Sequence, residues 1–130
     1  MLELTEEQAI FLKKPMLVYI GTKRSDGSIQ INPAWFEFRD GYFFLNSVKG
    51  RHWPAHIEKE REATLAFFDP EDARIFLEIE AKPVEIIEEG AKDHINELSI
   101  RYTGKPFELP NGEKRIKIKM EPVKVNGTVK

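Results

Sequence analysis

The segment of this 130-residue sequence with the most evident chemistry is 46–54, NSVKGRHWP. It places two cations, Lys49 and Arg51, just before Pro54, which suits the first turn of a helix. Neither of the two residues before the proline, His52 and Trp53, is a good N-cap, so the free N–H groups at the helix start need an acceptor. A phosphate group would supply one, assisted by the helix dipole and both cations.

The same segment opens with two polar residues, Asn46 and Ser47, at the end of a predicted strand. There they could hydrogen-bond the ligand that the two cations attract. The alternative is an ordinary surface loop whose charges are solvated. The residues alone leave both interpretations open.

A second candidate is the segment 32–36, NPAWF. Pro33 interrupts an apolar stretch that otherwise favours a strand, and a proline there removes a ladder hydrogen bond and marks a bulge or an edge. Such a site leaves backbone groups free to meet the polar edge of a flat heterocycle, with Trp35 as an apolar wall. Core aromatic residues beside a structural kink are the alternative.

Other polar clusters give weaker evidence of a functional site. His52 and His56 are four apart, as in zinc-binding pairs, but no glutamate follows His52 and His94 is remote. With no cysteine in the chain we expect no metal site. Glu78 and Glu80 share one face of a predicted strand and are expected to be solvated. No nucleophile motif is present, so no side chain is predicted to be catalytic and any reaction is assigned to a bound cofactor.

The elements that must position these residues follow from patterning. A capping box at Thr5 and Gln8 predicts a short helix to about Lys13. Alternation and turn signals predict strands, the first buried on both faces and the second interrupted at Pro33. The expected strands are 16–20, 29–38, 42–45, 64–68, 74–87 and 114–125, with helices over 54–61 and 91–103. Six or seven antiparallel strands with short helices indicate a mainly β (α+β) small barrel, a single domain spanning residues 1–130.

Composition excludes several classes of protein. Hydrophobic residues make up 41% and charged residues 32%, with a formal net charge of -2, which argues against nucleic-acid binding. The absence of cysteine excludes disulfides and thiolate catalysis. No apolar run approaches the roughly 20 residues that span a bilayer, and the first residues are acidic. We therefore expect a cytoplasmic protein without membrane partners.

The sequence resembles the pyridoxamine 5'-phosphate oxidase-like split-barrel superfamily, in particular its small flavin- or deazaflavin-dependent oxidoreductases. The order and spacing of several degenerate pieces carry this resemblance. They are 26–36 (DGSIQINPAWF), 40–44 (DGYFF), Gly50-Arg51 with the helix leading to 64–67 (TLAF), and 101–106 (RYTGKP). The resemblance implies a six-stranded antiparallel split β-barrel with short flanking helices, forming a homodimer with two cofactors at its interface.

Site residues carried over by position divide into two groups. One group would border the isoalloxazine or deazaflavin ring: Asn32, Pro33 and Trp35. The other would face the ribityl phosphate: Asn46, Ser47, Lys49, Arg51, His52 and Trp53. The family usually has a lysine two positions after the arginine of this turn, where this chain has Trp53.

The function implied is a flavin-dependent oxidoreductase that transfers hydride between a bound cofactor and a small, planar substrate. The cofactor expected is FMN, with the deazaflavin coenzyme F-420 as the alternative. A non-catalytic dimer that binds or sequesters flavin or haem is the competing interpretation. A structural dimer that binds nothing is the third.

Overall fold

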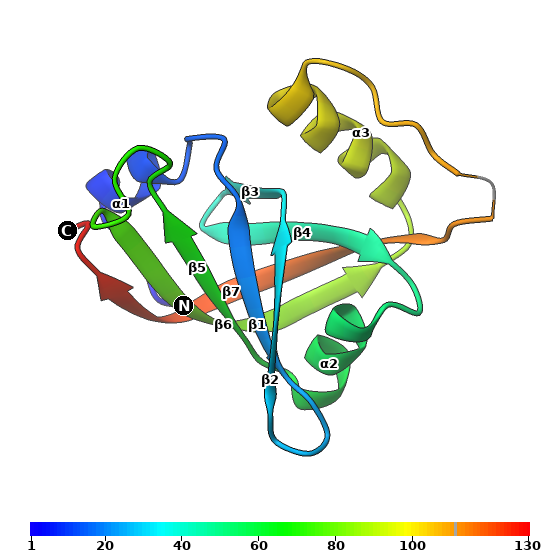
Figure 1. Ribbon diagram of the computed structural model, residues 1–130, viewed down its shortest axis with the longest axis horizontal. Helices are drawn as coiled ribbons and strands as arrows, with labels where there is room; N and C mark the ends of the chain where they lie inside the picture. Colours follow the sequence, from blue (N-terminus) through cyan, green and yellow to red (C-terminus); the bar gives the residue numbers. More distant parts are fainter. Residues whose placement is uncertain (111) are drawn as a thin grey trace.

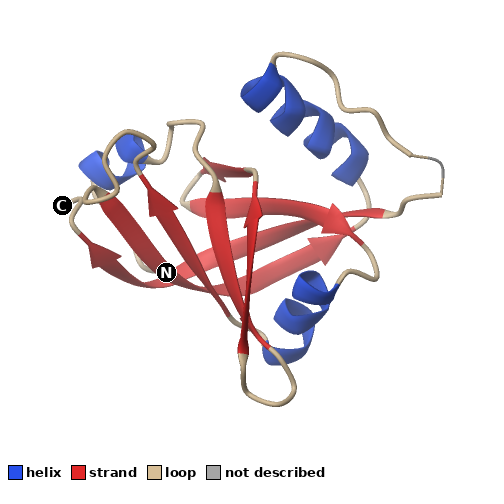
Figure 2. Ribbon diagram, viewed as in Figure 1, coloured by secondary structure: helices blue, strands red, loops and turns tan. Residues whose placement is uncertain are grey.

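The computed structural model describes residues 1–110 and 112–130, and within them three helices and seven strands (Figure 1, Figure 2). The helices are α1 (Glu6–Phe11), α2 (His52–Glu60) and α3 (Ala91–Thr103). The strands are β1 (Val18–Lys23), β2 (Ile29–Ala34), β3 (Phe36–Arg39), β4 (Tyr42–Val48), β5 (Ala63–Phe68), β6 (Phe76–Ile87) and β7 (Arg115–Gly127).

All strand pairs are antiparallel, and the sheet has the order β2-β1-β5-β6-β7-β4-β3. Its two end strands, β2 and β3, are consecutive in the chain and separated only by Trp35. The sheet therefore curls until its ends meet at this residue, which gives an incompletely closed barrel. This confirms the predicted fold class, with seven strands where six were expected.

The extra strand arises because the predicted strand 29–38 breaks at Trp35 and not at Pro33. Pro33 stays in the ladder, opposite Tyr19 of β1. Its missing N–H costs nothing there because β2 pairs on one side only, and an edge strand is where proline is tolerated.

The barrel interior is filled by aromatic and aliphatic side chains. Phe36 packs edge-on to Phe67 with ring centroids 4.7 Å apart, and Phe43 stacks on Phe67 at 5.4 Å. All three rings are fully buried, and each such side chain contributes on the order of 1.5–3 kcal/mol to folding. The alternation predicted for the strand 74–87 is confirmed from Phe76, where the strand begins, with Leu77 and Ile79 buried and Glu78 and Glu80 exposed.

The first predicted strand is wrong in two respects. It begins at Val18, two residues later than expected, and it alternates between buried and exposed side chains. Tyr19 is 39% exposed on its outer face. Within the described chain no element covers this face of β1, so the strand has the one-sided burial typical of antiparallel sheets.

The start of α2 also differs from the prediction. The helix begins at His52 with Arg51 as its N-cap, and Pro54 is its third residue. The first turn of a helix has no intrahelical partner for its N–H groups, so proline is tolerated there without breaking a helical bond. Arg51 offers no side-chain cap, as expected for a poorly capped helix.

α1 and α3 follow their predicted signals. The Thr5 and Gln8 capping box is formed on both sides, and Gly104 ends α3 in the left-handed conformation. α3 and the connection after it lie on one side of the barrel in Figure 1, beside the end where β4 leads into α2. Among the residues described, no helix is both long and apolar enough to cross a membrane.

Candidate functional site

A cleft of about 530 Å³ lies where β4, β7, α2 and α3 come together. Binding sites for small molecules and cofactors have volumes of roughly 300–1,000 Å³. Both tryptophans of the chain line this cleft. Five of the nine residues predicted from the sequence meet in it: Pro33, Trp35, Asn46, Arg51 and Trp53.

One apolar wall is built around Trp35, which leaves the sheet between β2 and β3. Its indole stacks on the Tyr102 ring, with centroids 5.3 Å apart and planes inclined by 18°. Phe107 packs edge-on against the same indole at 6.4 Å. The Tyr102 hydroxyl donates a 2.7 Å hydrogen bond to the Met16 carbonyl, and burial raises the pKa of this phenol. The indole is therefore held flat against a fixed ring.

Arg101 fixes α3 in place next to that wall. Its guanidinium donates to the Phe36 carbonyl at 2.6 Å and to the carbonyls of Lys13 and Lys14 at 2.9 and 3.2 Å. These carbonyls lie just after α1 and at the start of β3, so one side chain ties three segments together. The RYTGKP segment that resembles the family thus positions the cleft wall through Arg101 and Tyr102.

Trp53 forms part of a second apolar wall. It is buried, belongs to the barrel core and lines the cleft at the start of α2. The sequence resemblance predicts a lysine at this position, whereas Trp53 offers an apolar surface.

A second cation in the cleft comes from Arg115, the first residue of β7. Glu113 lies between the two arginines, with its Oε1 3.8 Å from Arg51 and 3.7 Å from Arg115. Both distances exceed hydrogen-bond length. Burial lowers the pKa of the Arg115 guanidinium, and the neighbouring charge of Arg51 acts in the same direction.

Sequence reasoning missed Arg115. By strand alternation it shares the outward face of Lys117 and Lys119, which are only partly buried. Arg115 alone is 5% exposed, and it lines the cleft together with residues of α3 and of the connection after it. The sequence carries no signal of this burial, because the residues that cover Arg115 are brought to it only by tertiary packing.

Asn46 reaches the cleft, but its amide is engaged by the protein. Its Nδ2 donates to the Ala91 carbonyl at 2.8 Å, and its Oδ1 accepts a 2.9 Å bond from Nε of Arg115. Ser47, the next residue along β4, is fully buried and does not line the cleft. Adjacent residues of a strand point to opposite faces, so the two side chains cannot serve one ligand on one face together.

Three further predicted residues lie outside the cleft lining. Asn32 accepts a 2.9 Å hydrogen bond from Gln30 within β2. Lys49 is exposed and pairs with Glu88, Nζ to Oε1, at 3.3 Å. His52 is exposed at the start of α2. Their roles toward a ligand stay predictions.

The His52 and His56 rings lie 6.4 Å apart on α2. Nδ1 of His56 is 3.0 Å from the hydroxyl of Thr22. Among the described residues, no group of three or more potential metal ligands is found. The prediction that this pair binds no structural metal stays a prediction.

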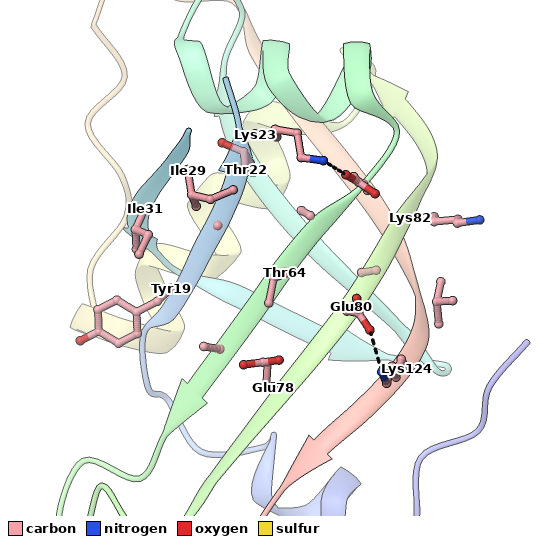
Figure 3. Close-up of a pocket in the computed structure, with 16 residues that line it drawn as sticks. Tyr19, Thr22, Lys23, Ile29, Ile31, Thr64, Glu78, Glu80, Lys82 and Lys124 are labelled. Carbon is pink, nitrogen blue, oxygen red and sulfur yellow. Dashed lines mark ion pairs between the residues drawn. The ribbon is translucent and has the colours of Figure 1, made fainter. Parts of the chain in front are cut away.

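A separate hollow of about 770 Å³ lies on the outer face of β1, β5 and β6 (Figure 3). Tyr19, Ile29 and Ile31 contribute exposed apolar surface to it. Four of its charged side chains form ion pairs, Lys23 with Glu62 at 3.4 Å and Lys124 with Glu80 at 3.9 Å. None of the predicted cofactor residues lines this hollow.

Comparison with known proteins identifies the fold. No family model matches the chain, and no curated protein matches it. Among solved structures, an F-420 reductase has a TM-score of 0.84 at 21% identity, covering 95% of this chain and 98% of its own. A protein from Listeria innocua provisionally designated pyridoxamine 5'-phosphate oxidase has a TM-score of 0.71 at 15% identity, over 93% and 94% of the two chains. This is the split-barrel fold of the pyridoxamine 5'-phosphate oxidase-like proteins.

The split barrel confirms the fold that the sequence resemblance implied. HupZ from Group A Streptococcus shares it, with a TM-score of 0.67 at 20% identity over 94% of this chain and 91% of its own. The near-complete coverage of each chain means that the cleft lies within the shared fold.

Proposed function

We propose that the cleft binds a flavin-type cofactor, FMN or the deazaflavin coenzyme F-420, and that the protein is an oxidoreductase. The observation that carries this proposal is the meeting of both tryptophans and an arginine pair in one cleft of cofactor size. The likeness in fold to an F-420 reductase over nearly the whole of both chains supports the choice of cofactor class.

The residues present fit such a group. Trp35 and Trp53 offer aromatic and apolar surface to a flat ring system. The guanidinium of Arg51 makes no hydrogen bond to any described residue, and Arg115 uses only its Nε, so both have donors left for an anion. Arginine binds phosphate oxygens in a bidentate manner. When bound, the cofactor would supply the hydride chemistry, and the chain's own residues would bind it, orient it and exclude water.

Glu113 competes for the same arginines. Its Oε2 is buried and has no hydrogen-bond partner among the described residues. A carboxylate left in that state is poorly compensated, while a phosphate dianion would satisfy both guanidiniums. We therefore expect the cofactor phosphate to take the position between the arginines, with Glu113 turned away from it.

We also propose that the protein is a homodimer. Support comes from the apolar side chains left on the outer face of the sheet, with Ile31 66% and Ile29 55% exposed beside Tyr19. A monomer rarely leaves such residues contiguous on one face. A second copy seated there would bury them in an interface of more than roughly 1,200 Å².

The absorption spectrum of the purified protein tests the cofactor class, because flavin, deazaflavin and haem absorb at different wavelengths. The protein is first incubated with FMN, F-420 or haemin and then desalted. Retention of FMN or F-420 at one molecule per chain supports the proposal. Retention of haem alone would favour a haem-binding dimer, and a colourless protein in all three cases would contradict cofactor binding.

Catalysis is tested separately from binding. The loaded protein is reduced anaerobically, and reoxidation of the cofactor is followed with a panel of quinones, enones and nitroaromatics. Turnover with any member supports an oxidoreductase. Tight binding without turnover by any of them would favour the non-catalytic alternative.

A further inference from the structure

A buried line of polar side chains runs from β3 into the cleft. Nε2 of His94 lies 3.4 Å from Oε1 of Glu37, an ionic contact in which neither atom has a hydrogen-bond partner among the described residues. Its Nδ1 lies 3.1 Å from Nδ2 of Asn46. Oδ1 of Asn46 in turn accepts from Nε of Arg115. His94, Asn46 and Arg115 are each less than 7% exposed. Four side chains from β3, α3, β4 and β7 thus connect the barrel wall to one of the cleft arginines.

The partners of Asn46 fix the orientation of its amide. The Ala91 carbonyl can only accept a hydrogen bond, and Nε of Arg115 can only donate one. Nδ2 must therefore face Ala91 and Oδ1 must face Arg115. The second Nδ2 proton then points at His94, whose Nδ1 has to be an acceptor. In this arrangement the single ring proton of His94 is on Nε2, toward Glu37.

A second proton on His94 is incompatible with this arrangement. Its Nδ1–H would face the NH₂ group of Asn46, donor against donor. Rotating the amide would satisfy His94 but would set Oδ1 against the Ala91 carbonyl and Nδ2 against Nε of Arg115. At least one buried hydrogen bond is lost in either case, and an unmade buried bond is costly.

Charged groups from three elements surround His94. Glu37 faces it from β3, with Arg39 at 3.9 Å from the other carboxylate oxygen. From β7 come Arg115 and Lys117, the latter above the Phe44 ring that the imidazole contacts edge-on. On α3 itself, Asp93 is adjacent in the chain and Arg101 acts on Glu37. Glu37 favours the charged imidazole and the cations oppose it.

We propose that His94 is a positioning residue that holds Arg115 toward the cleft through Asn46, and that a second proton on His94 releases this hold. The affinity of the cleft for a phosphate-bearing ligand then depends on the protonation state of His94. The consequence for cofactor affinity rests on the proposed function, whereas the coupling of His94 to Arg115 does not.

The coupling is tested in the cofactor-free protein by nuclear magnetic resonance. The ring nitrogens of His94 and the Nε–H signal of Arg115 are followed from pH 8 to pH 5, the range in which histidines change charge. We expect the Nε2–H tautomer at pH 8 and a shift of the Arg115 signal with the same midpoint as His94. In His94→Gln, which keeps an acceptor for Asn46 but does not titrate, the Arg115 signal should stay constant. His56→Gln, outside the line, should leave the wild-type behaviour unchanged.

FMN binding between pH 8 and pH 5 supplies the second readout. The phosphate itself gains a proton near pH 6 and weakens binding in every variant. Wild type should lose roughly tenfold more affinity than His94→Gln, the size of one hydrogen bond to a charged group. A constant Arg115 signal while His94 titrates, no titration of His94 down to pH 5, or equal losses in both proteins would overturn the inference. Coupled signals without any binding of FMN or F-420 would instead contradict only the proposed function.

Discussion

Replacing Arg51 with alanine tests whether this side chain binds the cofactor phosphate, separately from the binding of the ring system. Arg51 lines the cleft and is exposed by 55% at its side chain, and its one ionic contact with a described residue is loose, at 3.8 Å to Glu113. Hydrogen bonds to charged groups contribute about 1.5–3 kcal/mol. Solvent screening at this exposure places Arg51 at the lower end of that range. We expect FMN affinity to fall by about tenfold in Arg51→Ala.

The ligand and the variant each have a matched control. Riboflavin has the same ring system and no phosphate, so its affinity should be nearly unchanged in Arg51→Ala. Lys59→Ala removes an exposed cation of α2 that does not line the cleft, so it should lose much less FMN affinity. The free energy of unfolding should change by no more than about 0.5 kcal/mol in either variant.

The assay is quenching of flavin fluorescence at about 0.1 M salt, where screening is moderate. Parallel titrations of FMN and riboflavin into the wild type and both variants give six affinities. Equal losses for both ligands in Arg51→Ala would mean that the arginine shapes the cleft and does not bind the phosphate. No loss for either ligand would refute the role of the arginine pair.

Four further outcomes are expected. Glu113→Gln should raise FMN affinity in the same titration, because the carboxylate no longer competes for the arginines; a weaker FMN complex would contradict this. Tyr102→Phe should lower the free energy of unfolding in urea by about 1 kcal/mol, since it removes the buried bond to the Met16 carbonyl; an unchanged midpoint would disprove it. Ile31→Glu should convert a dimer to a monomer in light scattering, and a wild type that is already a monomer at micromolar concentration would refute dimerisation. Glu37 has a lowered pKa in the folded state. Its contribution to stability is therefore present above about pH 4.5 and is lost as the pH falls through its folded pKa. From pH 5 to pH 3 the urea midpoint of the wild type should fall more than that of Glu37→Gln, and equal falls would contradict this.

Most helices and strands could be predicted from the sequence because each follows a pattern within its own residues, such as alternation or a helix cap. The alternation around Leu77 and Ile79 predicted β6, since one face of that strand is buried and the other is not. The capping box at Thr5 predicted where α1 begins. The break at Trp35 was missed because no local pattern shows that β2 ends there and that the chain continues as β3 at the opposite edge of the sheet.

The candidate site was predicted only where a short segment of the sequence carries a local pattern. Arg51 and Trp53 were found because a glycine, cations and a helix start occur together in one short segment, and Trp35 was found because Pro33 interrupts a predicted strand beside it. Arg115, Glu113 and His94 are 64, 62 and 43 residues from Arg51 along the chain and join the site only through tertiary packing. Ser47 was grouped with Asn46 by proximity in sequence, although neighbouring strand residues face opposite ways.

The central claim is that the cleft binds a flavin-type cofactor, and tryptophan fluorescence tests it directly. The chain has two tryptophans, Trp35 and Trp53, and both line the cleft. A ligand in the cleft must therefore quench the tryptophan emission. We predict that FMN or F-420 quenches most of the emission, saturating at one molecule per chain. Binding that saturates with the tryptophan emission unchanged, or no binding of either cofactor, would contradict the account.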